Sequence, residues 1–243
     1  MNTFKHMIKS SWVVALSFCG CFSAGAGTFV DNFSAGLNPA YWTAFESSTG
    51  SFSVDASQGD VRFTKVGPNR TGGMDQIGMS LNLANLGGPV AGDFSAQLEF
   101  RNAQIPGPGL DQVELATGYA NGSIFFNVRD NSNGNNAHVW TGSIQGNLPT
   151  TALDGIFRIT RSGGIVSGYL NDALIYSTGN ASALTAVNFT LNNNLGSNDA
   201  TSVAFDNFRL EAASIPEPST AALLALGGLA LAGRRKCRAS GNA

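Results

Sequence analysis

Three short apolar runs separated by tight turn signals constrain the fold of this chain more than any other feature. Residues 157–161 read FRITR, residues 165–170 read IVSGYL, and residues 173–177 read ALIYS. Ser162-Gly163-Gly164 separates the first two runs, and Asn171-Asp172 separates the last two. Because connections of this length and composition join antiparallel strands, the sequence predicts a β-meander.

The middle of the chain also shows apolar and polar residues in alternation, the period of two that is typical of a strand. In FSAQLEFR, residues 94–101, the apolar Ala96, Leu98 and Phe100 alternate with polar neighbours, as in a strand with one face on a core. Between residues 27 and 212 no stretch has a helical period. We therefore predict one all-β domain over residues 27–212, which a chain of 243 residues can accommodate.

The net charge of this domain limits the classes of molecule that it can bind. The chain has 14 basic and 16 acidic residues. Six basic residues lie near its ends: Lys5, Lys9, Arg234, Arg235, Lys236 and Arg238. Without these six, eight basic residues face all 16 acids, a net charge of -8 for the rest of the chain. Such a surface repels phosphate backbones and anionic lipids, and we do not expect nucleic acid among the partners.

The first 26 residues predict a signal peptide. Lys5 and Lys9 precede the apolar stretch SWVVALSFCGCF, and Ala24-Gly25-Ala26 fits a small-residue cleavage site. We expect the mature chain to begin at Gly27. The alternative is a buried first strand or helix.

Cysteine and histidine usage limits the chemistry of the body. Cys19 and Cys21 belong to the expected signal, and Cys237 lies in the tail, so the middle has no cysteine. His138 is its only histidine. Disulfides, thiolate catalysis and zinc sites with several cysteine or imidazole ligands are therefore excluded there.

The C-terminal tail, residues 213–243, contains an apolar run followed by basic residues. The run TAALLALGGLALAG, residues 220–233, would span about 21 Å as a helix, which is short for a bilayer and leaves a buried core helix as the alternative. Pro216 and Pro218 separate the run from the body, and RRKCR, residues 234–238, supplies a positive flank. We predict a single transmembrane helix over about 220–233.

Pro216-Glu217-Pro218, the apolar run and the basic end with Arg234 and Arg235 occur in the order that resembles the PEP-CTERM sorting family. The resemblance covers about the last 28 residues. It implies a Gram-negative producer of exopolysaccharide whose membrane protease, an exosortase, cuts near Pro-Glu-Pro. The protein would be exported, anchored transiently in the inner membrane and passed to the cell surface or the extracellular space. Such tails are also labelled ice-binding protein C-terminal domains, but the middle has no regular threonine array.

The body resembles concanavalin A-like jelly-roll sandwiches, including laminin G-like and laminarinase-type modules. The likeness rests on FVDNFSAGLNPAYWTA at residues 29–44, on the meander, and on VAFDNFRL at residues 203–210. It implies two curved sheets, paired first and last strands, and ligands on the concave face or the end loops. It also implies that Asp206 is a candidate ligand for a structural calcium ion, with cross-strand hydrogen bonding as the alternative. We expect no other cofactor.

Laminarinase-type catalysis needs two carboxyl groups about 5 Å apart, and the sequence does not show such a pair. Asp111 and Glu114 are the nearest candidates, but three positions along a strand place them on opposite faces. We interpret Asp111 as a turn residue and Glu114 as a solvated strand residue, and we expect no catalytic residue.

A hairpin over residues 123–142, SIFFNVRDNSNGNNAHVWTG, offers a candidate binding face. Because alternate residues of a strand point to opposite faces, one set points inward: Phe126, Val128, Ala137 and Val139. The remaining alternate residues point outward and are five candidate glycan-binding residues: Phe125, Asn127, Arg129, His138 and Trp140. An aromatic ring beside amide and guanidinium donors suits a sugar. The alternative is that Trp140 covers the core, while we assign Trp42 to anchoring the first strand.

Three functions remain open. The first is a non-catalytic module that binds matrix polysaccharide at the cell surface. The second is a structural surface or biofilm protein without a ligand. The third is a glycan-active enzyme of the laminarinase-type fold.

Overall fold

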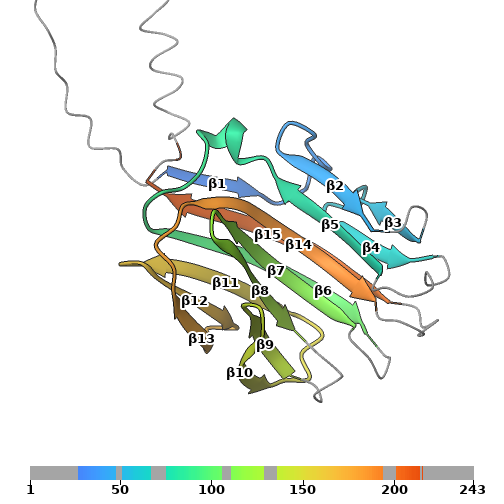
Figure 1. The fold of residues 1–243 in the computed structure, drawn as a ribbon. Coiled ribbons are helices and arrows are strands. Elements are labelled where there is room, and N and C mark those ends of the chain that lie inside the picture. Colours follow the sequence, from blue (N-terminus) through green and yellow to red (C-terminus); the bar gives the residue numbers. More distant parts are fainter. Residues whose placement is uncertain are drawn as a thin grey trace, which may run out of the picture.

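A computed structural model describes residues 27–47, 51–66, 75–105, 111–128, 136–193, 201–213 and 215. These residues form two antiparallel β-sheets (Figure 1). The described helical structure is one short 3-10 helix, η1, at Leu83–Leu86. The all-β prediction is thus confirmed. The expected signal peptide and the expected helix at residues 220–233 lie outside the described residues.

The first sheet, called sheet A, has the strand order β13-β12-β11-β6-β15-β4-β3, and β1 also pairs with β15. Its strands are β1 (Gly27–Asp31), β3 (Phe52–Asp55), β4 (Val61–Lys65), β6 (Phe94–Gln104), β11 (Gly155–Ser162), β12 (Ile165–Leu170), β13 (Ala173–Gly179) and β15 (Ser202–Ala212).

The second sheet, called sheet B, has the order β10-β9-β8-β7-β14-β5-β2. Its strands are β2 (Trp42–Glu46), β5 (Asp75–Leu81), β7 (Gln112–Tyr119), β8 (Gly122–Val128), β9 (Asn136–Trp140), β10 (Ile144–Pro149) and β14 (Leu184–Asn193). The two sheets enclose one apolar core. Among the described residues, no helix has the length and apolar character needed to span a membrane.

The predicted meander corresponds to β11, β12 and β13. Asn171 and Asp172 both have positive φ, at 48° and 64°, the conformation that a two-residue hairpin turn requires. In β6 the buried Ala96, Leu98 and Phe100 alternate with more exposed neighbours. Local alternation therefore gave the correct faces in both regions.

The first and last strands pair, as the resemblance implied. Gly27 lies opposite Ala212, and the start of β1 lies beside the end of β15 (Figure 1). Asp31, at the end of β1, accepts a 2.8 Å hydrogen bond from the indole nitrogen of Trp42. The Trp42 ring is buried and lies 5.0 Å from the ring of Phe208, edge to face. Trp42 therefore anchors the first strand, as expected.

Replacing this anchor should destabilise the whole sandwich. We expect Trp42→Ala to lower the free energy of unfolding by about 3–5 kcal/mol, because the change leaves a large cavity between the sheets and removes the hydrogen bond to Asp31. Urea unfolding of the mature protein, followed by circular dichroism, measures this loss. A loss below about 1 kcal/mol, typical of an exposed position, would contradict the anchoring role.

Candidate functional site

The face of sheet B that points away from sheet A consists of rows of positions in register, many of them polar, and we call it the polar face. One row crosses six strands in register and consists of Thr43, Ser80, Asn188, Ala116, Phe125 and Trp140. The next row consists of Phe45, Gly78, Thr190, Glu114, Asn127 and His138. A third contains Gln76, Asn192 and Gln112. Residues between these rows, such as Met79, Leu115 and Phe189, fill the core.

Glu114 lies at the centre of the polar face. Its side chain is only 4 % exposed, so the interpretation of Glu114 as a solvated residue was wrong. Thr190 Oγ1 donates to Glu114 Oε1 at 3.2 Å, and Asn192 Nδ2 lies 3.4 Å from Glu114 Oε2. Burial raises the pKa of the Glu114 carboxyl to about 7, and these two hydrogen bonds oppose the shift only in part. The carboxyl can therefore be a donor or an acceptor near neutral pH.

Asp111 lies on the other side of β7, as its spacing from Glu114 predicted. It is fully buried, and its Oδ1 accepts a hydrogen bond from Asn193 Nδ2 at 3.1 Å. Among the described residues of the polar face, Glu114 is the one acidic side chain. A catalytic pair of carboxyl groups is not formed by these residues.

Two asparagines of the polar face present acceptors without a protein partner. Asn192 Oδ1 and Asn188 Oδ1 are buried atoms that form no hydrogen bond within the part of the chain that the structure describes. A buried acceptor without a partner costs about 1–3 kcal/mol. A water molecule or a ligand hydroxyl at these atoms would remove that cost.

Trp140 and Phe45 contribute apolar surface on either side of these polar groups. Trp140, on β9, is 41 % exposed, in agreement with its predicted outward direction. Phe45, on β2, is partly exposed and lies across Gly78, where an added Cβ would come within 2.4 Å of the ring. Four strand spacings separate β5 from β9, a distance of about 19 Å. The face can thus accommodate an extended chain.

The predicted exposure of His138 was wrong, because its side chain is only 2 % exposed. His138 has the expected parity, since it is in register with Asn127 and Trp140 follows two residues later. Parity alone therefore does not determine how deeply a position on this face is covered, since Trp140, on the same strand, is 41 % exposed. The main chains of Phe125 and Asn127 belong to β8, but their side chains and all of Arg129 lie outside the described residues.

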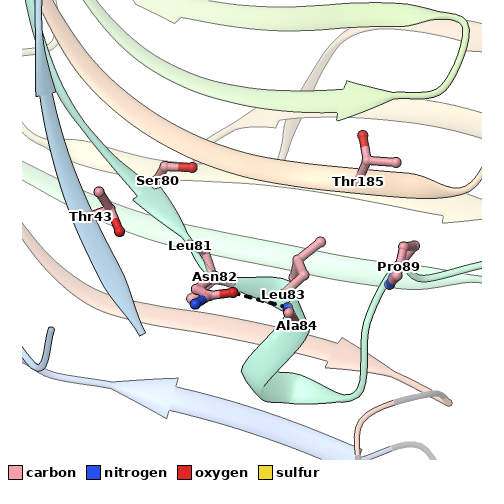
Figure 2. A pocket seen from close by; sticks show the side chains of 8 residues that line it. All are labelled: Thr43, Ser80, Leu81, Asn82, Leu83, Ala84, Pro89 and Thr185. Carbon is pink, nitrogen blue, oxygen red and sulfur yellow. Dashed lines mark hydrogen bonds between the residues drawn. The ribbon is translucent and has the colours of Figure 1, made fainter. Parts of the chain in front are cut away.

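A pocket of about 410 Å³ lies at the β2/β5 side of the polar face (Figure 2). Thr43 and Ser80 connect it to the row that ends at Trp140. Asn82 begins η1 by accepting a hydrogen bond from the backbone N–H of Ala84 at 3.2 Å, and Figure 2 shows this bond beside the pocket. The described residues that line it are Thr43, Ser80, Leu81, Asn82, Leu83, Ala84, Pro89 and Thr185. Hydroxyl and amide groups beside apolar walls, in this volume, suit a small hydroxylated ligand.

Asp206, the candidate calcium ligand, lies on the outer side of sheet A. Its Oδ2 is 3.0 Å from Arg101 Nη1, and its Oδ1 accepts a hydrogen bond from the backbone N–H of Asn207. The carboxylate is therefore already paired with a protein cation. A calcium ion needs six or more oxygen ligands, and these residues do not fit that requirement. Among the described residues, no group of three acidic, histidine or cysteine side chains could hold a metal.

Sequence reasoning missed Phe45, Asn188, Thr190, Asn192 and the pocket. The segment VNFTLNN, residues 187–193, did contain a signal, because its polar residues recur at every second position between apolar ones. That pattern predicts a polar outer row on a central strand. The contribution of Phe45 has no comparable signal, since it depends on the absence of a side chain at Gly78 of the neighbouring strand.

The buried carboxyl makes the stability of the fold depend on pH. The pKa of Glu114 is about 7 in the folded protein and near its ordinary value of 4.5 when unfolded. As the pH rises from about 4.5 to about 7, the unfolded state loses this proton first, so the free energy of unfolding falls by about 3 kcal/mol in total. Glu114→Gln stays neutral at every pH and should lose this dependence. Urea midpoints of both proteins between pH 4.5 and 8 measure it, and parallel profiles would contradict the assignment.

The tail of this chain matches a known sorting motif, and its fold is similar to that of several solved structures. Residues 214–236 match the PEP-CTERM protein-sorting motif. Pro216, Glu217, Pro218, Arg234 and Arg235 lie within this match, although outside the described residues. The motif indicates an exported protein that is anchored transiently in the membrane before an exosortase processes it. No curated protein sequence matches the chain significantly.

Solved structures with the same fold have low sequence identity to this chain. The "Cellulose induced protein, Cip1" is 16% identical, with a TM-score of 0.53 over 75% of this chain and 96% of that one. The Emp47p carbohydrate recognition domain is 11% identical, with a TM-score of 0.53 over 76% and 94%. The alginate lyase AlgAT5 is 13% identical, with a TM-score of 0.52 over 71% and 95%. The protein thus has the β-sandwich fold of these structures and carries a PEP-CTERM sorting motif at residues 214–236.

Proposed function

We propose that the protein is a non-catalytic, polysaccharide-binding module that acts outside the cell after sorting. The observation that carries this proposal is the shared row of Trp140, Asn188, Ser80 and Thr43, which combines an exposed ring with amide and hydroxyl groups. Sugars present apolar ring faces and a rim of hydroxyls, and this row offers a partner for both. The sorting motif and the carbohydrate-related names of similar folds support the same function.

The geometry favours binding along a polysaccharide rather than at its end. Trp140 and the pocket near Ser80 lie on the same face about four strand spacings, or about 19 Å, apart. Asn188 lies between them in the same row, and its buried Oδ1 has no hydrogen-bond partner among the described residues. Each contact is weak on its own, so affinity would come from several sugars of one chain.

Glu114 favours a second candidate function, a glycan-active enzyme. A buried carboxyl with a pKa of about 7 has the property expected of a general acid or base. However, hydrolysis by the common mechanism needs a second carboxyl group, which the described polar face does not provide. Incubation with oligosaccharides followed by mass spectrometry separates these functions. New products that disappear in Glu114→Gln would favour the enzyme.

Replacing Trp140 tests the binding function directly. We expect Trp140→Ala to weaken retention on the bound polysaccharide about tenfold, because it removes about 1–2 kcal/mol of ring burial against a sugar. The thermal midpoint should change little, because the ring is substantially exposed. A glycan array of the mature protein identifies the ligand, and affinity electrophoresis measures the change.

Leu174→Ala is the matched control. Leu174 is also an exposed apolar residue, but it lies on β13 of sheet A. It should bind like the unmodified protein. Equal binding of the two variants would argue against the Trp140 row, and absence of any array signal would favour a structural surface protein.

A further inference from the structure

We infer that, before processing, the end of the sandwich from which the sorting tail emerges lies against the surface of the lipid bilayer. This end, called the tail end, is defined by the row that joins Gly27, Ala212, Phe94, Arg161 and Val166. Six described loop segments surround it: residues 37–41, 82–93, 119–123, 140–144, 162–165 and 179–184.

The first argument is the length of the connection to the tail. Ile215 is buried in the core, and its backbone N–H donates to Ala212 O at 3.1 Å. An added Cβ on Gly27 would come within 1.8 Å of Ile215 O, so this residue is fixed tightly against β1. Five peptide units connect Ile215 to Thr220, where the apolar run begins. Fully extended, they reach about 18 Å at most.

The apolar run itself allows little further distance. Its 14 residues span about 21 Å as a helix, whereas the hydrocarbon layer is about 30 Å thick. A run shorter than the layer draws its flanking residues toward the lipid boundary. The connection therefore keeps the tail end within about 18 Å of the hydrocarbon layer while the tail is inserted.

The second argument is the charge of the tail end. The six loop segments contain one charged residue, Asp93, whose Oδ1 accepts a hydrogen bond from the backbone N–H of Gly163. The neighbouring cation Arg161 is buried and donates to the carbonyls of Val90, Gly92 and Ser182. This end can therefore approach a zwitterionic lipid surface without stripping water from several charges.

The tail end also offers apolar groups to the lipid. Ile165, at the start of β12, is 49 % exposed, and Ala84 and Pro89 are exposed beside η1. Ala84 and Pro89 also line the pocket of the polar face. If that pocket binds glycan as proposed, docking keeps it covered until the tail is cut.

Cysteine accessibility tests the docking without any glycan. The three native cysteines are replaced by serine, and either Ile165→Cys or Val66→Cys is introduced into the full chain. Val66 is the matched control, because it is 61 % exposed and follows β4 at the opposite end. Both proteins are reconstituted into phosphatidylcholine vesicles and labelled with a maleimide on a large polyethylene glycol.

We expect the thiol at position 165 to react about tenfold more slowly than the thiol at position 66, which corresponds to a preference of about 1.4 kcal/mol for the covered state. A Gly/Ser spacer of about 20 residues after Ile215 should equalise the rates, since its coil length exceeds the reach of the native connection. Equal rates without the spacer, or protection that survives the spacer, would overturn the inference. Protection found only with an exosortase present would assign this end to the protease instead.

Discussion

The packing of Phe189 between the two sheets determines the orientation of the polar face. Its ring, on β14 of sheet B, lies 4.8 Å from Phe205 and 5.8 Å from Phe63, both on sheet A, and 5.2 Å from Trp42. The described body contains no cysteine, so burial of such rings has to hold the sheets together. Because side chains alternate along a strand, fixing Phe189 inward directs Asn188 and Thr190 outward.

The core also fixes the place where the sorting tail begins. β1 and β15 meet at one corner, and Ile215, three residues after the end of β15, still belongs to the apolar core. The sorting motif starts within a residue of this buried position. The same apolar packing that stabilises the body therefore limits how far the body can be from the membrane during sorting.

Patterns local in sequence predicted a large part of the fold. The meander, the faces of β6 and the anchoring of β1 by Trp42 depend on neighbouring residues and on turn conformations. The site was predicted less well. Alternation gave the correct parity for Trp140 and His138 but not the burial of His138, and it left Glu114 in solvent. Asp206 matched a family pattern, yet its partner Arg101 comes from β6, about a hundred residues earlier.

The sequence by itself determined the all-β class, the alternation of apolar and polar residues along the strands, and the sorting motif. Each of these features depends only on residues that lie close together in the chain. Only the tertiary structure decided which carboxyl is buried and where the pocket forms. Burial raises the pKa of Glu114 to about 7, and Thr190 and Asn192, which contact its carboxyl, are more than 70 residues away. Burial is set by all strands that surround a position, and the sheet order that assembles them is not readable from any one of those strands.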